Sequence, residues 1–389
     1  MKGFKRKRGD SWQLIVYAGM DEDTKKKKYI RKTVKGSEKK ADLELAKLIT
    51  EVSSNQYVPP AKENVEEFLN FWLENYAKNQ LRLRTYESYR MIIKQHINPK
   101  LGKINLDKLT PKHIIMYCNE KQTNGKLDRK GNPVFQPLSA RTVRYHFRTL
   151  HRAFRDGVRW GKLRTNPLDL VDPPKPVEKE MKILLPEEIR KFLSVAKEDR
   201  LYPLYLTAIN LGMRRGELFG LRWQDVDLEA GFIRVQQQLL KPGYKPIFSP
   251  PKSKSGRRLL ELPVSLVNEL KHWREEQQKE KDFFGDEYAR YDLVFCQPNG
   301  RPLCHGSMDR WSFKKILKKA GLQNIRFHDL RHTTATFLLS QGVNPKVVQE
   351  ILGDSTITVV LDTYSHVIPT IHKMAMSHWD KFQGGEENA

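Results

Sequence analysis

His328-Asp329-Leu330-Arg331-His332 is the stretch of this chain that indicates most about its fold and chemistry. It lies in a predicted helix over 326–341, where a histidine and an arginine three residues apart share one face. Further along, Tyr364 stands in the polar stretch Asp362-Thr363-Tyr364-Ser365-His366. Arginines that bind an anion and a nearby phenol are what covalent attack on a phosphodiester requires. The first hypothesis from the sequence is therefore the cutting and rejoining of DNA strands.

A second arginine motif precedes this one, in Gly212-Met213-Arg214-Arg215-Gly216-Glu217-Leu218. Its first glycine ends a predicted apolar helix over 201–211, and Arg214 opens the next helix. Backbone N–H groups at such a junction also point toward anions. Glu217, one turn further on, is placed to orient a guanidinium. Read alone, the motif more often marks a surface arginine with a neighbouring carboxylate.

A basic turn, Ser249-Pro250-Pro251-Lys252-Ser253-Lys254-Ser255-Gly256-Arg257-Arg258, joins two predicted strands. A lysine at its tip can protonate a leaving oxygen if the surrounding cations lower its pKa. Lysines at exposed hairpin tips are common, so the turn by itself is weak support for catalysis.

The charge balance favours a polyanionic partner. The 389 residues include 70 Lys+Arg against 46 Asp+Glu, a formal net charge of +24. Such an excess holds nucleic acid by neutralising phosphates and releasing counterions, so binding should weaken steeply with salt. The alternative is a basic protein that binds ribosomes or acidic surfaces.

Several classes of protein are disfavoured by composition. Three cysteines without a CxxC spacing fit a reducing cytoplasm better than a disulfide frame or structural zinc. No apolar run approaches the roughly 20 residues that a membrane span needs, and the basic N-terminus lacks the apolar core of a signal peptide. The sequence has no GxxxxGK[ST] motif and no carboxylate cluster for two-metal chemistry. We therefore expect neither a metal nor another cofactor.

The predicted fold class is α+β and mostly helical, in three domains. Residues 1–55 are expected to form a small β-sheet plus a helix, with strands over 11–17 and 28–34 and a helix capped by Ser37. Residues 62–165 read as a helical bundle. Residues 180–383 read as a mixed helical domain with a small antiparallel sheet. Within the last domain we expect strands over 232–239, 245–248 and 258–262, and helices over 201–211, 266–281, 309–320, 326–341 and 345–352, with another that starts at Pro186.

One helix of the bundle, over 139–160, is expected to face phosphates. Five arginines occupy the side opposite its apolar residues: Arg141, Arg144, Arg148, Arg152 and Arg155. A solvated face is the simpler interpretation, but the absence of alternating acids favours contact with nucleic acid.

Taken together and in this order, the arginine motif, the basic turn, His-x-x-Arg and Leu-Gly-x-Ser followed by tyrosine resemble the tyrosine recombinase (phage integrase) family. The resemblance spans the chain and is strongest to integrases of conjugative transposons and temperate phages. It implies an arm-type DNA-binding domain at 1–55, a core-binding domain at 62–165 and a catalytic domain at 180–383.

The resemblance also implies the catalytic set. Arg214 and Arg331 would clamp the scissile phosphate, and His328 would assist the phosphate or the nucleophile. Tyr364 would attack to form a 3′-phosphotyrosyl link. Lys252 is favoured as the general acid, and Lys254 stays an alternative because the length of the turn varies in the family.

One position departs from the family pattern. The family commonly has Leu-Gly-His-Ser, and this chain has Leu352-Gly353-Asp354-Ser355. An ionised aspartate cannot donate a hydrogen bond and would repel a phosphate. Three possibilities follow: Asp354 turns away, is protonated, or pairs with a lysine.

The implied activity is site-specific integration and excision of a mobile element in the bacterial cytoplasm. The resemblance implies core and arm sites on double-stranded DNA, a homotetramer linked by tails such as 368–382, and possible help from an excisionase and a host DNA-bending protein. A type IB topoisomerase and a DNA-binding protein with impaired catalysis are the alternatives. A zinc site at His328 and His332 is disfavoured because Arg331 lies between them.

Overall fold

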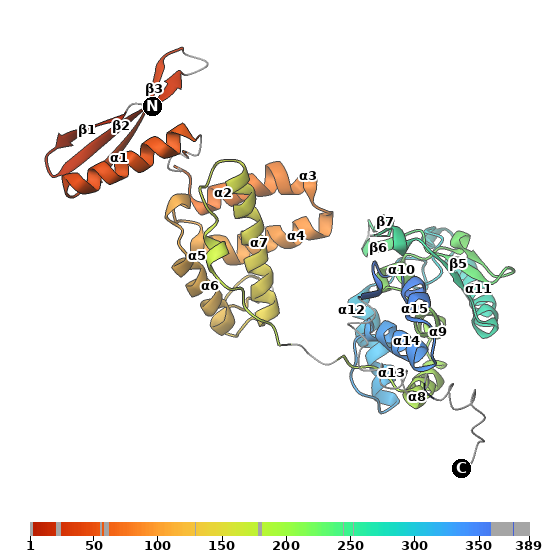
Figure 1. Cartoon of the computed structure of the whole chain (residues 1–389). Helices are drawn as coiled ribbons and strands as arrows, with labels where there is room; N and C mark the ends of the chain where they lie inside the picture. Colours follow the sequence, from red (N-terminus) through yellow and green to blue (C-terminus); the bar gives the residue numbers. More distant parts are fainter. Residues whose placement is uncertain are drawn as a thin grey trace. The chain divides into compact units, whose positions relative to one another are not determined.

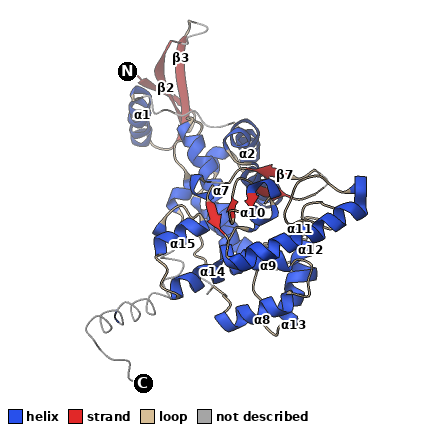
Figure 2. Ribbon diagram, turned by 90° about the vertical axis from the view of Figure 1, so that its right-hand side faces the viewer, coloured by secondary structure: helices blue, strands red, loops and turns tan. Residues whose placement is uncertain are grey.

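The computed structural model describes residues 3–20, 25–54, 57, 62–128, 130–177, 181–243, 245–251, 253–358 and 376, and only the backbone of Lys254. The chain divides into two compact units, Met1–Glu178 and Lys179–Ala389 (Figure 1). The first contains both predicted N-terminal domains and the second contains the predicted domain 180–383. Helices dominate and the strands form small antiparallel sheets (Figure 2), which confirms the predicted fold class. Within the described residues, no helix is both long and apolar enough to span a membrane.

The N-terminal module is a three-stranded antiparallel sheet with one helix against it. The strands β1 (Gly3–Arg8), β2 (Ser11–Met20) and β3 (Lys27–Lys35) lie in that order, and the helix is α1 (Glu38–Ser53). Leu14 and Val16 on β2 are fully buried against α1. The hydroxyl of Ser37 accepts the backbone N–H of Lys40 at 3.4 Å, so the predicted cap is confirmed.

Strand β1 was not predicted. It pairs with β2 through a turn at Gly9, whose φ is +55°. Most of the side chains of β1 are exposed and basic, so the strand has no apolar face to bury. It is held in the sheet by its backbone pairing with β2. Lys5 also forms a 3.0 Å ion pair with Glu38 of α1. A strand of this kind leaves no alternating pattern for sequence analysis to detect.

The helical bundle has its own apolar core around Trp72. Its elements are α2 (Val65–Phe71), η1 (Trp72–Ala77), α3 (Lys78–Gln80), α4 (Leu83–Ile92), η2 (Ile93–Ile97), α5 (Asn98–Leu101), η3 (Leu106–Lys108), α6 (Pro111–Asn124), α7 (Ala140–Arg159) and η4 (Pro167–Leu170). The indole N–H of Trp72 donates to the buried carboxylate of Asp156 at 3.0 Å, which ties η1 to α7.

Helix α7 has the two sides that the sequence predicted. Val143, Leu150 and Phe154 are fully buried on one side. On the other side, Arg141, Arg148 and Arg155 are exposed and Arg144 and Arg152 are half-buried. The exposed arginines form a basic stripe along the helix.

The second unit packs helices around a large apolar core. The helical elements are α8 (Pro186–Ala196), α9 (Tyr202–Leu211), α10 (Arg215–Phe219), η5 (Trp223–Asp225), η6 (Lys254–Gly256), α11 (Val264–Phe284), η7 (Gly285–Glu287), α12 (His305–Met308), η8 (Asp309–Phe313), α13 (Lys314–Lys319), α14 (Asp329–Ser340) and α15 (Pro345–Leu352). Strands β4 (Val226–Asp227), β5 (Phe232–Arg234) and β8 (Leu259–Glu261) form one sheet, and β6 (Gln238–Lys241) and β7 (Ile247–Ser249) form another.

Two predicted elements differ from the structure. The predicted strand 232–239 is divided between β5 and β6, which belong to different sheets. Between them, the side chain of Gln237 donates to the carbonyl of Gly220 at 2.8 Å, a tertiary contact that redirects the chain. Helix α14 begins at Asp329 instead of 326, because the Asp329 carboxylate accepts the backbone N–H of Arg326 and closes a turn before the helix.

The bundle core also contains a buried polar cluster. The ring of His146 is 1% exposed, its Nδ1 lies 3.0 Å from the hydroxyl of Tyr117, and its centroid lies 4.7 Å from that of His96. Burial, followed by the charges of His96 and Lys121, lowers the pKa of His146 to about 3. The pKa of His96 is also lowered, by burial and by Lys121. Both imidazoles are therefore neutral in the folded bundle at neutral pH.

We predict that the bundle loses stability as the pH falls from about 6.5 toward about 3, by up to about 1.4 kcal/mol per pH unit for one such group. The unfolded His146 binds a proton below its ordinary pKa and the folded one does not, so acid favours unfolding. Hydrogen exchange of α7 amides in the full chain, corrected for intrinsic rates, measures the loss. His146→Gln should remove part of this loss. Equal pH dependence in the wild type and in His146→Gln would contradict the prediction.

Candidate active site

The junction between α9 and α10 places the first arginine. Helix α9 ends at Gly212, whose φ is +56°, and a Cβ there would lie 2.6 Å from Leu352 of α15. Only glycine allows this close approach. Arg214 lies two residues further on, and its backbone N–H donates to the Glu217 carboxylate at 3.0 Å. The glycine therefore lets α15 approach the start of α10, where Arg214 lies.

Packing of α14 on α9 places the second arginine. The hydroxyl of Thr334 donates to the carbonyl of Ile209 at 2.7 Å and ties the two helices together. Arg331, one turn earlier, is 5% exposed. One of its terminal nitrogens, Nη1, donates to the carbonyls of Gly212 at 2.9 Å and Leu352 at 2.7 Å. The ends of α9 and α15 therefore fix this guanidinium.

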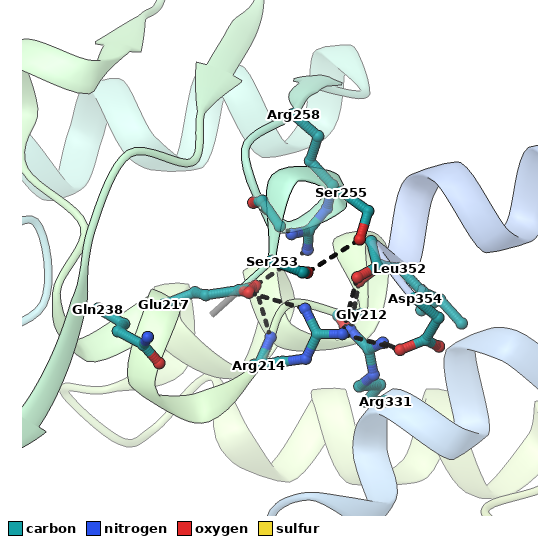
Figure 3. Close-up of polar contacts among 12 residues, drawn as sticks. Gly212, Arg214, Glu217, Gln238, Ser253, Ser255, Arg258, Arg331, Leu352 and Asp354 are labelled. Atoms are coloured by element: carbon teal, nitrogen blue, oxygen red, sulfur yellow. Dashed lines mark hydrogen bonds and ion pairs between the residues drawn. The ribbon is translucent and has the colours of Figure 1, made fainter. Parts of the chain in front are cut away.

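A third guanidinium, that of Arg258, completes the cluster (Figure 3). It donates to the carbonyl of Ile351 at 2.6 Å and to the carboxylate of Glu217 at 3.0 Å. Glu217 is 2% exposed and also accepts from Arg214 at 3.0 Å. Burial raises the pKa of Glu217, but Arg258 and Arg214 outweigh that effect, so its pKa is lowered. Glu217 is therefore an ionised carboxylate that orients two arginines, as its spacing predicted for Arg214.

Arg258 was assigned no role from the sequence. It sits at the end of the basic turn, one residue before β8, where the pattern Arg257-Arg258-Leu259-Leu260 offers two arginines. Strand alternation directs one of two neighbouring side chains inward. A buried carboxylate such as that of Glu217 needs a cationic partner. This need and the alternation of the strand are together the signal that would have indicated Arg258.

Asp354 joins the two expected catalytic arginines. Its Oδ1 accepts from Nη2 of Arg214 at 2.8 Å and from Nη2 of Arg331 at 2.7 Å (Figure 3). The preceding residue, Gly353, has a φ of +67°, and a Cβ there would lie 2.7 Å from Arg258. Asp354 therefore faces the arginines, and the possibility that it turns away is wrong. The structure brings Arg214 and Arg331 together on a single carboxylate oxygen.

His328 lies at the edge of this cluster. It occupies the position just before α14, three residues before Arg331, and its side chain makes no capping hydrogen bond, so the prediction that both lie within one helix is wrong for His328. His328 is exposed to solvent, but protein lies against one side of its ring. The centroid of this ring lies 5.2 Å from that of His332, and the two rings are nearly perpendicular. Partial desolvation, followed by the charges of His332 and Arg331, lowers the pKa of His328 to about 4. The imidazole is neutral at pH 7 and can accept a proton.

Two expected catalytic residues, Lys252 and Tyr364, lie outside the described residues, as does the side chain of Lys254. The backbone of the lysine turn is described on either side. The carbonyl of Ser255 lies 2.8 Å from the position of a Cβ on Gly353, so the turn abuts the arginine cluster. His366 and the tail 368–382, apart from Met376, also lie outside the described residues.

Known proteins are similar in sequence to this chain over most of its length. The model of the phage integrase family matches residues 182–370, and that of the phage integrase N-terminal SAM-like domain matches 64–122. A tyrosine recombinase XerC-like protein of Caldanaerobacter subterraneus subsp. tengcongensis is 30% identical over 92% of this chain and 93% of its own. The ICEBs1 integrase of Bacillus subtilis is 26% identical over 95% of this chain and 96% of its own.

A solved structure shares the fold. The Tn1549 transposon integrase in complex with a circular intermediate DNA superposes with a TM-score of 0.66 at 24% identity, over 82% of this chain and all of that one. The fold and the relatives define a tyrosine-type DNA strand-exchange enzyme. The chain belongs to the phage integrase family and is a site-specific tyrosine recombinase, as the sequence motifs predicted.

We predict that Glu217→Gln lowers the free energy of unfolding of the second unit by about 3 kcal/mol, because the buried guanidinium of Arg258 and the half-buried one of Arg214 lose their shared carboxylate. Urea unfolding of the full chain, followed by far-UV circular dichroism, measures the change. Glu350→Gln is the matched control, because Glu350 pairs with Lys346 on the exposed surface of α15 at 3.4 Å. It should change stability by less than about 1 kcal/mol. Equal effects of the two substitutions would contradict the buried role of Glu217.

Proposed function

We propose that this recombinase cuts and rejoins double-stranded DNA through a 3′-phosphotyrosyl intermediate at Tyr364, and so integrates and excises a mobile element. One observation carries the proposal: Nη2 of Arg214 and Nη2 of Arg331 converge on one anionic oxygen, that of Asp354. Donors arranged to share one anion suit the non-bridging oxygens of a phosphodiester.

The chemistry follows from charge. The phenol oxygen of Tyr364 attacks phosphorus, a new O–P bond forms, and the bond to the 5′ oxygen breaks. Negative charge grows on the non-bridging oxygens, where Arg214 and Arg331 stabilise it. The negative charge of the bound phosphodiester raises the pKa of His328 above its value in the free protein, and this imidazole then accepts the phenolic proton. Lys252, or Lys254 as the alternative, protonates the departing 5′ oxygen. Attack by a 5′-hydroxyl of the partner strand reverses these steps, so bond energy is conserved and no nucleotide is consumed.

The two N-terminal domains would supply affinity and site choice. The exposed arginines of α7 support contact of domain 62–165 with core DNA beside the cut, and the basic strands β1 and β3 support contact of domain 1–55 with arm sites. Domain 180–383 would carry catalysis.

Recombination of two duplexes requires four strand cuts, and each subunit has one Tyr364. We therefore propose a homotetramer on DNA, in the bacterial cytoplasm where such DNA lies. The tail 368–382 would link subunits, and an excisionase and a host DNA-bending protein would set direction.

Covalent trapping tests the proposal. The substrate is a duplex site selected by the protein from a randomised pool, nicked at successive positions so that a short cleaved fragment diffuses away. The wild-type protein should form a covalent DNA adduct, and Tyr364→Phe should form none. An adduct that survives in Tyr364→Phe refutes the nucleophile. Binding without any adduct would favour a DNA-binding protein with impaired catalysis, and relaxation of any plasmid regardless of sequence would favour a type IB topoisomerase.

We predict that Arg331→Ala lowers the rate of adduct formation by at least about 100-fold, because one preorganised donor of the transition state is lost. DNA affinity, measured by fluorescence anisotropy, should change by less than about tenfold because many other cations contact phosphates. Arg190→Ala is the control, since this arginine lies on α8 with its side chain 71% exposed and pairs with the exposed Glu187. If Arg331→Ala lost DNA binding and cleavage in parallel, the prediction that Arg331 serves cleavage rather than affinity would be contradicted.

A further inference from the structure

The two-arginine clamp, defined here as the guanidiniums of Arg214 and Arg331, holds an anion that belongs to the protein itself. Asp354 contributes one oxygen to both Nη2 groups, and its side chain is 18% exposed. Acidic and basic groups alternate through the cluster, since Glu217 lies between Arg214 and Arg258. The carboxylate of Asp354 is therefore the anion shared by the two expected phosphate-binding arginines.

The clamp does not need Asp354 to keep its shape. Arg331 retains two carbonyl acceptors, on Gly212 and Leu352, through its other terminal nitrogen. Arg214 retains the carboxylate of Glu217 and the carbonyl of Gly353. If Asp354 leaves, both guanidiniums stay oriented, and the Nη2 groups that pointed at its oxygen become available to another anion.

The backbone of Asp354 is anchored separately from its carboxylate. Its N–H donates to the carbonyl of Gln349 at 3.2 Å, and its carbonyl accepts from the side chain of Gln349 at 3.0 Å. Rotation about the Cα–Cβ bond of Asp354 can thus remove the carboxylate from the clamp while these contacts to α15 persist. The exposed fraction of the side chain gives it a path to solvent.

We propose that Asp354 is an internal stand-in for the scissile phosphate: it fills the clamp in the free protein and must be displaced by a DNA phosphodiester before cleavage. This inference rests on the proposed function, because it takes the clamp as the site of the scissile phosphate. Asp354 then sets a threshold for cleavage. A phosphate held firmly in register by the rest of the protein displaces the carboxylate, and a loosely bound phosphate does not.

Inorganic phosphate tests the displacement without DNA. In chloride buffer, Asp354→Asn should have a lower thermal midpoint than wild type, because the two guanidiniums lose their shared anion. As phosphate replaces chloride at constant ionic strength, this gap should shrink by at least half, since phosphate takes the place of the carboxylate. Glu350→Gln removes the same charge on α15 outside the clamp, and its offset from wild type should not change. A gap that is absent in chloride, or that stays constant with phosphate, overturns the proposal.

Adduct formation on the nicked duplex tests the consequence for catalysis. Asp354→Asn should form the adduct at least about tenfold faster than Glu350→Gln, because the carboxylate that accepts two charge-assisted hydrogen bonds from the clamp no longer competes. Comparison of these two variants cancels the general gain in attraction for DNA, because each loses one negative charge. Equal or lower rates in Asp354→Asn overturn the proposal. If wild type and both variants form no adduct, the proposed function fails, and the phosphate titration still decides whether Asp354 occupies an anion site.

Discussion

The mutual repulsion of three guanidiniums is the constraint that the active-site region must satisfy. Arg214, Arg258 and Arg331 meet where α9, α14, α15 and the basic turn converge, and Arg331 is almost fully buried. Two like charges 4 Å apart cost about 4 kcal/mol at an effective dielectric constant of about 20. The carboxylates of Glu217 and Asp354 offset this cost, and each is shared by two arginines.

Backbone carbonyls at helix ends provide the remaining acceptors. The last carbonyls of a helix have no partner within the helix, so they are available to donors from elsewhere. Arg331 bonds the carbonyls of Gly212 and Leu352, at the ends of α9 and α15, and Arg258 bonds that of Ile351. Both helices end in a left-handed glycine, Gly212 or Gly353, which lets the neighbouring chains approach. The helix ends thus fix the arginines before any substrate binds.

Charge elsewhere in the protein is used differently. The arginines of α7 and the lysines of β1 and β3 are largely exposed. Under the proposed function, hydrated cations of this kind supply affinity for DNA that depends on salt. The arginines of the cluster are instead held in fixed orientations, because each of their terminal nitrogens has a specified acceptor. Under the proposed function, this contrast separates the binding of DNA from the chemistry at one phosphate. It also explains why a change in the cluster should affect cleavage more than binding.

The sequence by itself indicated most of the charged residues of the site, though not Arg258, and most of the helices. Caps such as Ser37, prolines such as Pro111 and Pro186, and apolar periodicity locate helices because these signals act within one or two turns. Only the tertiary structure decided the contacts between distant segments. Strand β1, the division of 232–239, the inward turn of Arg258 and the pairing of Asp354 with two arginines depend on residues far apart in the chain. The sequence named the charged groups, but a charge has no partner until folding brings one within hydrogen-bonding distance.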